Sequence, residues 1–224
     1  MRTLTAAEML SVWERSTGRP PLRQALELLV CAEPEQRWAD LPFGQVCRGL
    51  FRLRSLLFGP VMPGVVSCPN CGERMGFTFE CESIEAAPLV PAALLRIAAG
   101  DREIEMRIPS AGDLLAVQSA GELLRRCATT PVEVVGALVH AASERVAEAD
   151  PLSETLLDLV CAACGHPWQA ALDIASYLGR EIAHEAHRLL SDVHRLASAY
   201  GWREEDILAM SPARRRAYLE MAGV

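Results

Sequence analysis

Apolar residues recur at helical spacing through most of the first 60 residues. Thr5 and Glu8 form a capping-box pattern before an apolar stretch, so we expect a helix that ends near Gly18. The same periodicity predicts a second helix over residues 21–31 and a third over 43–58. Gly59 and the proline after it stop the third helix.

The middle of the chain alternates between strand and helix patterns. Alternating apolar residues predict a strand over 77–81 and a hairpin with arms at 94–98 and 103–108. Ser110 can cap a helix that continues towards Cys127. Thr130 and Pro131 form the start signal of a further helix, which we expect to reach about Ala149.

The last third of the chain begins with short strands and ends in helices. Apolar runs predict strands over 156–160 and 168–174. An amphipathic stripe then predicts one long helix from about 173 to 200. Two shorter helices should follow, one over 203–210 and one capped by Ser211.

Two matched cysteine pairs stand out from this pattern. Cys68 and Cys71 form one CxxCG motif, and Cys161 and Cys164 form a second, with 89 residues (72–160) between them. Four thiolates complete the tetrahedral shell of a structural Zn²⁺ site, and each glycine can take the positive φ that the turn needs. A redox dithiol and ordinary buried thiols are the alternatives. A redox CxxC typically begins a helix after a strand, whereas strand-like runs follow both motifs here.

These elements predict an α+β fold that is mainly helical, with a small antiparallel zinc ribbon interrupted by a hairpin and a helical insertion. Three regions follow: an N-terminal helical region, 1–60; a split zinc ribbon with an inserted β-hairpin and two helices, 61–175; and a C-terminal helical region, 176–224. A metal that joins such distant segments stabilises the fold by closing a long loop.

The composition of the chain limits which binding partners and which cellular compartment we expect. The net charge is −7 and every basic residue is arginine, which argues against non-specific nucleic-acid binding. The cluster at 214–216 is interpreted as a solvated helix face. The chain shows no export signal and no apolar run of the ~20 residues that a membrane helix needs, so a cytoplasmic, reduced protein without a membrane partner is expected. Four further cysteines are then interpreted as core residues: Cys31, Cys47, Cys81 and Cys127.

No catalytic constellation emerges. His184, His187 and His194 lie near one face of the long helix, but no cysteine or carboxylate pattern completes a metal site, so a surface role is favoured. His166 follows the second motif and could replace a thiolate ligand, although four cysteines suffice. Phosphate loops, nucleophile elbows and isolated acid pairs are absent from the sequence, so we expect no enzyme.

Several segments, taken in order, resemble one known family. They are the turn 41–44, the end of the third predicted helix at 57–60, the first cysteine motif with Glu73, the strand-to-helix step 107–114, the second motif with His166 and Trp168, and the tail from His187 to Leu219. This order is similar to baseplate and baseplate-hub assembly proteins of contractile-tail phages of the T-even type, and of phage-like extracellular contractile injection systems. The resemblance covers roughly residues 40–222, and Ala162 replaces a proline common in the family.

The resemblance implies a non-enzymatic structural or assembly role in such a particle, with other baseplate or tail proteins as partners. It leaves residues 1–40 without a role, and it leaves open whether the protein stays in the particle. The alternative is a zinc-ribbon adaptor or regulator that touches nucleic acid, because Phe77, Phe79 and Trp168 could stack on bases. The tail from Tyr200 onward favours protein docking over DNA reading, because it lacks a strongly basic recognition helix.

Overall fold

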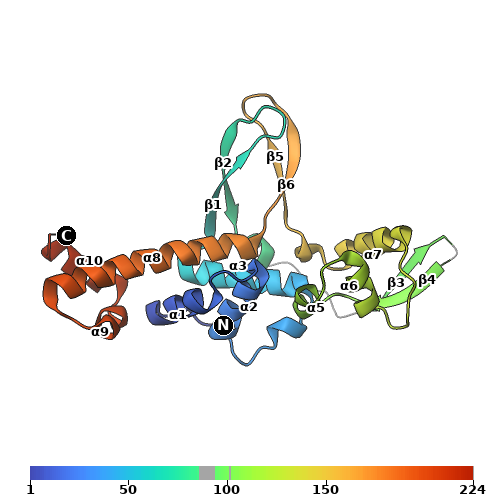
Figure 1. Ribbon diagram of the computed structural model, residues 1–224. Helices are drawn as coiled ribbons and strands as arrows, with labels where there is room; N and C mark the ends of the chain where they lie inside the picture. Colours follow the sequence, from blue (N-terminus) through green and yellow to red (C-terminus); the bar gives the residue numbers. More distant parts are fainter. Residues whose placement is uncertain (86–93, 101, 224) are drawn as a thin grey trace. The chain divides into compact units, whose positions relative to one another are not determined.

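The computed structural model describes residues 1–85, 94–100 and 102–223 (Figure 1). The fold is α+β and mainly helical, with small antiparallel two-stranded sheets, as the sequence predicts. Within the described residues, no helix combines the length and the apolarity that crossing a bilayer requires.

The chain divides into two compact units. Unit 1 comprises Met1–Pro34 and Ala175–Val224, and unit 2 comprises Glu35–Ile174. This division differs from the regions 1–60, 61–175 and 176–224 in two respects. The third helix belongs to unit 2, and the first two helices share a unit with the C-terminal region.

Unit 1 is built from helices that pack through apolar stripes. Thr5 and Glu8 form the expected capping box at the start of the first helix, with Glu8 N–H donating to Thr5 Oγ1 and Thr5 N–H donating to the Glu8 carboxylate. Leu10 of that helix packs with Ala186 and Leu189 of the long helix. The helices of unit 1 are α1 (Ala6–Ser16), α2 (Pro21–Ala32), α8 (Ile174–Tyr200), α9 (Glu204–Ala209) and α10 (Pro212–Met221).

The end of the chain folds back on α8. Leu196, Ile207 and Leu219 form a small apolar cluster. The side chain of Arg215 is buried among these helices, where its Nε lies 3.7 Å from an Asp192 carboxylate oxygen and its Nη1 donates to the Met210 carbonyl. The interpretation of the arginine cluster as a solvated face is therefore wrong for this residue, because α10 turns it towards the carboxylate on α8.

The first α-helix of unit 2 is α3 (Phe43–Phe58), at the predicted bounds. No side chain from its own N-terminus caps this helix. The buried carboxylate of Asp150 instead accepts a hydrogen bond of 2.8 Å from the Gly44 N–H. A Cβ on Gly44 would lie 1.9 Å from Asp150 Oδ1, so this close approach requires glycine.

A hairpin and two helices form an apolar core in unit 2. Leu95, Ile97, Met106 and Leu138 are buried in this cluster. Its elements are β3 (Leu94–Ala99), β4 (Arg102–Arg107), α6 (Ala120–Cys127) and α7 (Gly136–Ala149). A further helix, α5 (Ala111–Ala116), connects β4 to α6. The prediction for residue 101 in the hairpin turn lies outside the described residues.

Two helix boundaries in this core differ from prediction. The helix expected from Ser110 to Cys127 is two helices, because Ser119 has an extended backbone and caps α6 through the Glu122 N–H. The helix expected from Pro131 begins at Gly136 instead. Val132, Val134 and Val135 pack on the hairpin core before the helix begins, and this tertiary packing overrides the local start signal.

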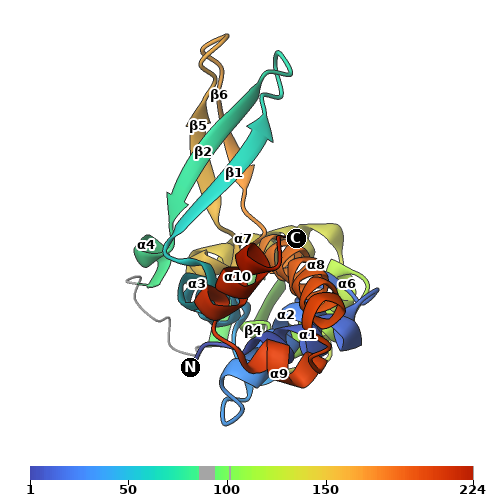
Figure 2. The same ribbon diagram turned by 90° about the vertical axis from the view of Figure 1, so that its left-hand side faces the viewer.

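The remaining strands form two antiparallel hairpins, which together we call the ribbon. One hairpin joins β1 (Val61–Ser67) to β2 (Arg74–Glu80), and the other joins β5 (Leu156–Val160) to β6 (Pro167–Ala171). The short elements α4 (Glu82–Glu85), η1 (Trp38–Asp40) and η2 (Pro151–Ser153) complete unit 2. Figures 1 and 2 both show the two hairpins side by side, with their turns at the same end.

Candidate metal centre

Each cysteine motif forms the turn of one ribbon hairpin, and the two turns share one backbone pattern. In the first, Cys68 N–H donates to the Glu73 carbonyl and Gly72 N–H donates to the Cys68 carbonyl, at 2.8 and 2.9 Å. In the second, Cys161 N–H donates to the His166 carbonyl and Gly165 N–H to the Cys161 carbonyl, at 2.9 and 2.8 Å.

Both turns also use glycine in the same way. Gly72 has a φ of 77° and Gly165 a φ of 71°. These values lie in the left-handed region, which residues with a Cβ rarely adopt. The glycine after each cysteine pair therefore lets the chain turn back into the second strand of its hairpin.

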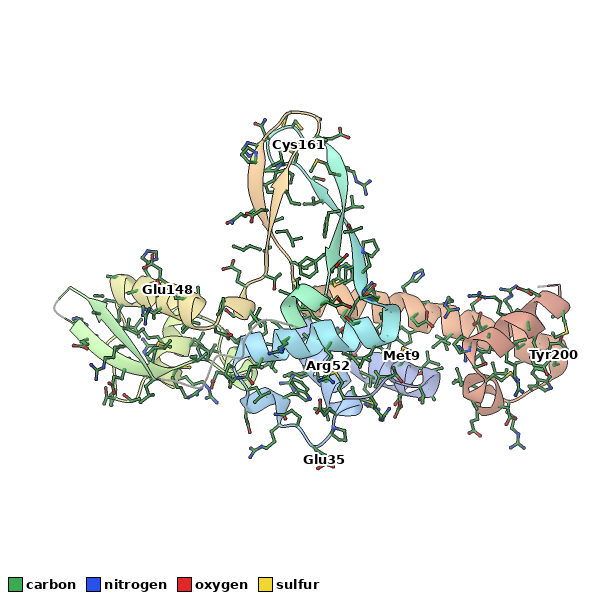
Figure 3. All side chains as sticks on the ribbon, turned by 180° about the vertical axis from the view of Figure 1, so that it is seen from behind. Met9, Glu35, Arg52, Glu148, Cys161 and Tyr200 are labelled. Atoms are coloured by element: carbon green, nitrogen blue, oxygen red, sulfur yellow. The ribbon has the colours of Figure 1, made fainter. Side chains whose placement is uncertain are left out.

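The four cysteine sulfurs converge at the end of the ribbon, where Figure 3 labels Cys161. Cys68 Sγ lies 3.8 Å from Cys164 Sγ, and Cys71 Sγ lies 3.6 Å from Cys161 Sγ. All four sulfurs lie within 4.8 Å of one another. Four sulfurs placed about 2.3 Å from one Zn²⁺ at tetrahedral angles are about 3.8 Å apart. The tetrad is therefore positioned to bind a metal ion, and its spacing fits zinc.

The two turns present their cysteines with the same burial. Cys68 and Cys161, the first of each pair, are each 2% exposed, whereas Cys71 and Cys164 are exposed. All four are free thiols in this structure. The ribbon thus contributes one inner and one outer sulfur from each hairpin, and neither hairpin alone supplies a complete ligand set.

Hydrogen bonds make the two exposed thiols, Cys71 and Cys164, unequal. The Asn70 amide, which donates to Cys164 Sγ at 3.5 Å, and then the His166 backbone N–H lower the pKa of the Cys164 thiol to about 6. The Glu73 backbone N–H favours the Cys71 thiolate, but the other thiols raise the pKa of Cys71 to about 12. A cation must therefore displace protons from the tetrad, so metal binding weakens as the pH falls.

Side chains of α3 hold the base of the first hairpin. The buried guanidinium of Arg54 donates from Nη1 to the carbonyls of Gly59 and Val61, each at 2.6 Å. The rings of Phe51 and Phe79 lie 5.6 Å apart, centroid to centroid. These contacts fix where β1 leaves α3, and they position the Cys68 turn at the far end of the strand.

The histidines that the sequence singled out lie outside the tetrad. The ring of His166 stacks over Trp168, with the centroids 6.3 Å apart. His184, His187 and His194 are exposed on α8, and His187 Nδ1 lies 2.7 Å from the Ala183 carbonyl oxygen. Among the described residues, the group of metal-ligating side chains consists of the four cysteines alone.

The remaining cysteines behave largely as core residues. Cys47, Cys81 and Cys127 are buried, whereas Cys31 is only half-buried. Burial raises the pKa of Cys47 to about 12 and that of Cys127 to about 11. Both thiols are therefore protonated at neutral pH and unreactive.

Sequence reasoning missed three residues that support the centre. Asn70 donates to a ligand sulfur, Arg54 anchors β1, and Met75 Sδ accepts the Ala162 N–H at 3.3 Å from the other hairpin. Asn70 carried a signal, because a side-chain amide inside a CxxC turn lies near both sulfurs. The other two carried none, because their contacts depend on how distant elements pack.

We compared the chain with protein-family models, curated proteins and solved structures, and no match was found.

Proposed function

We propose that the cysteine tetrad binds one Zn²⁺ ion in a purely structural role. The convergence of four sulfurs at tetrahedral spacing supports this proposal. Cys68, Cys71, Cys161 and Cys164 would all act as thiolate ligands. When bound, the ion supplies cross-linking between the two hairpins, and a four-thiolate shell leaves no open position for a substrate.

We further propose that the protein is a non-enzymatic structural or assembly component of a contractile injection particle, acting in or on its baseplate. The ordered resemblance of the cysteine motifs and the tail to baseplate proteins supports this role. The fold is compatible with an assembly role. Helices precede and follow the ribbon segments in the chain, and they offer packing surfaces for other tail proteins.

Two measurements test these proposals separately. Metal analysis of the purified full chain should find one zinc per chain, and none in a Cys68→Ser, Cys161→Ser double variant. A zinc-free, folded wild-type protein would contradict the metal proposal. Mass spectrometry of particles from the natural host should detect the protein or its complex with tail components. Its absence from both the particles and their assembly intermediates would contradict the baseplate role.

The alternative function, a ribbon that stacks on nucleic-acid bases, has less support. Phe79 packs against Phe51 on α3, and Phe77 and Trp168 are half-buried. Stacking on bases needs exposed ring faces and a positively charged groove. Binding of a single-stranded oligonucleotide at low salt would favour this alternative, and the absence of binding would count against it.

A further inference from the structure

One strand of each ribbon hairpin is largely apolar on both faces. β1 reads Val-Met-Pro-Gly-Val-Val before its final serine, and β5 reads Leu-Leu-Asp-Leu-Val. Nearly continuous apolar runs are typical of strands that are covered on both sides, whereas a half-exposed hairpin alternates apolar and polar residues. The sequences of β1 and β5 therefore indicate a second covering layer over these two strands, whereas β2 alternates apolar and polar residues.

Within the described structure, only one face of each hairpin is covered. Met62 is buried, and Phe77, Phe79, Leu157 and Leu159 are half-buried. Side chains fill the space between the hairpins in Figure 3.

The opposite faces expose large aliphatic side chains. Val61 and Val65 on β1 are 47% and 62% exposed, and Leu156 and Val160 on β5 are 43% and 65% exposed. Residues two apart on a strand share a face, so each pair forms one row. Pro63 extends the row on β1, and Pro167 lies opposite Val160 on the second hairpin. We call these two rows the outer ribbon faces.

The described outer positions carry two carboxylates, Glu80 and Asp158, and one arginine, Arg74. Glu80 pairs across the strands with Val61 on the first hairpin. On the second hairpin, Asp158 lies between Leu156 and Val160 on the same face and accepts a hydrogen bond from the Gln169 amide at 2.9 Å. Arg74, opposite Ser67 near the turn, is the basic residue among the described outer positions of both hairpins.

We propose that the outer ribbon faces dock into a different protein, whose apolar cleft carries arginine or lysine side chains that meet Glu80 and Asp158. This proposal deepens the assembly role given above and rests on it. A second copy of the chain fits the β5–β6 face less well. Packing the β5–β6 face on itself about a two-fold axis brings two Asp158 carboxylates together near its centre, and like charges placed opposite each other destabilise such a contact.

Site-specific photo-cross-linking in the natural host tests this proposal with the full chain. The probe p-benzoylphenylalanine replaces Val65 or Val160, and Val30, which is 49% exposed on α2, serves as the control position. We expect both ribbon positions to cross-link to a second protein at a segment containing apolar and basic residues, and position 30 to give no such product. Cross-links to another copy of this chain, or the absence of a product at both ribbon positions, would overturn the proposal.

A charge variant provides the second test. Val65→Asp should lower the cross-linking yield at position 160 roughly tenfold or more, because a charge in the apolar centre of an interface is strongly unfavourable. The zinc content should stay at the wild-type value, since Val65 is exposed. Glu80→Gln should lower the yield less. An unchanged yield in both variants would contradict docking through these faces. A cross-linked partner unrelated to contractile tails would leave docking intact and contradict the baseplate role.

Discussion

The strands of the ribbon and the helices of unit 1 bury very different amounts of apolar surface. Among the described residues of the four ribbon strands, Met62 alone is fully buried. In unit 1, Leu178, Leu189 and Leu196 of α8 are each 0% exposed. Two-stranded hairpins are marginally stable in water without further packing. The ribbon therefore has few apolar contacts of its own to stabilise it, and the proposed metal ion would supply the missing stability, whereas unit 1 has an apolar core.

Loss of a metal ligand should have the largest effect and should be confined to the ribbon. Cys161→Ser removes one buried sulfur of the tetrad, and structural zinc binding contributes roughly 10 kcal/mol or more in small zinc modules. We expect hydrogen exchange to lose protection over residues 61–81 and 156–171 while unit 1 keeps its own. Cys31→Ser, outside the tetrad, is the matched control. A Cys161→Ser protein that kept its thermal midpoint and metal content would contradict the comparison.

A substitution that creates a cavity in unit 1 should destabilise unit 1 and leave the zinc content of the ribbon unchanged. Leu189 is fully buried against Leu10 and Ala186, so Leu189→Ala should cost about 2–5 kcal/mol of unfolding free energy. Thermal denaturation should show a lower midpoint for unit 1, and metal analysis should show an unchanged zinc content. Leu190→Ala, at a half-buried position on the same helix, should cost less. Zinc loss in the Leu189→Ala protein would show that the two regions are not independent.

A substitution that strains the backbone of a cysteine turn should have a smaller effect, which is a loss of metal affinity. Gly72 and Gly165 have positive φ values, and a Cβ at either position would meet no atom within 4 Å. Gly72→Ala should therefore cost only backbone strain, about 1–2 kcal/mol, which corresponds to roughly a tenfold weaker zinc affinity. Competition with a chromogenic chelator measures this change. Gly136→Ala, at the start of α7, should leave the affinity unaltered.

The smallest change in unfolding free energy should come from protonating Glu8 in unit 1. Arg2 and the capping box lower the pKa of Glu8 to about 2 from an ordinary value near 4.5. The stability that Glu8 contributes is therefore complete above about pH 4.5 and is lost as the pH falls towards 2. Glu8→Gln should cost roughly 1 kcal/mol at pH 7 and nothing near pH 2. Thermal melts across this range measure the difference.

The ribbon should respond to acid at a higher pH than Glu8 does. Protons compete with the metal for all four thiolates, so zinc release should precede the protonation of Glu8. Zinc release followed with a dye during the same acid titration should show this order. Zinc retention down to pH 3 would contradict a thiolate site.

Sequence patterns predicted the elements that are governed by local signals. The capping box at Thr5, the glycine after α3 and the CxxCG spacing each specify a local geometry, and the structure contains all three. Tetrad convergence was also predictable, because two half-sites of one kind in a single chain suggest one complete site.

The features that the sequence did not predict depend on contacts between residues far apart in the chain. α7 begins only at Gly136 because Val132 and Val134, which precede it in the chain, pack on the apolar core that contains the β3–β4 hairpin. Asp150 caps α3 from 106 residues away, and Arg215 turns inward to face Asp192. These contacts join residues whose proximity no local pattern encodes.

X-ray absorption at the zinc edge on the purified full chain would establish whether four thiolates hold one zinc ion in the ribbon. We expect one zinc per chain with four sulfur neighbours at about 2.3 Å and no nitrogen or oxygen ligand. A shell containing nitrogen or oxygen, or a folded ribbon whose cysteines are paired as disulfides without metal, would contradict it.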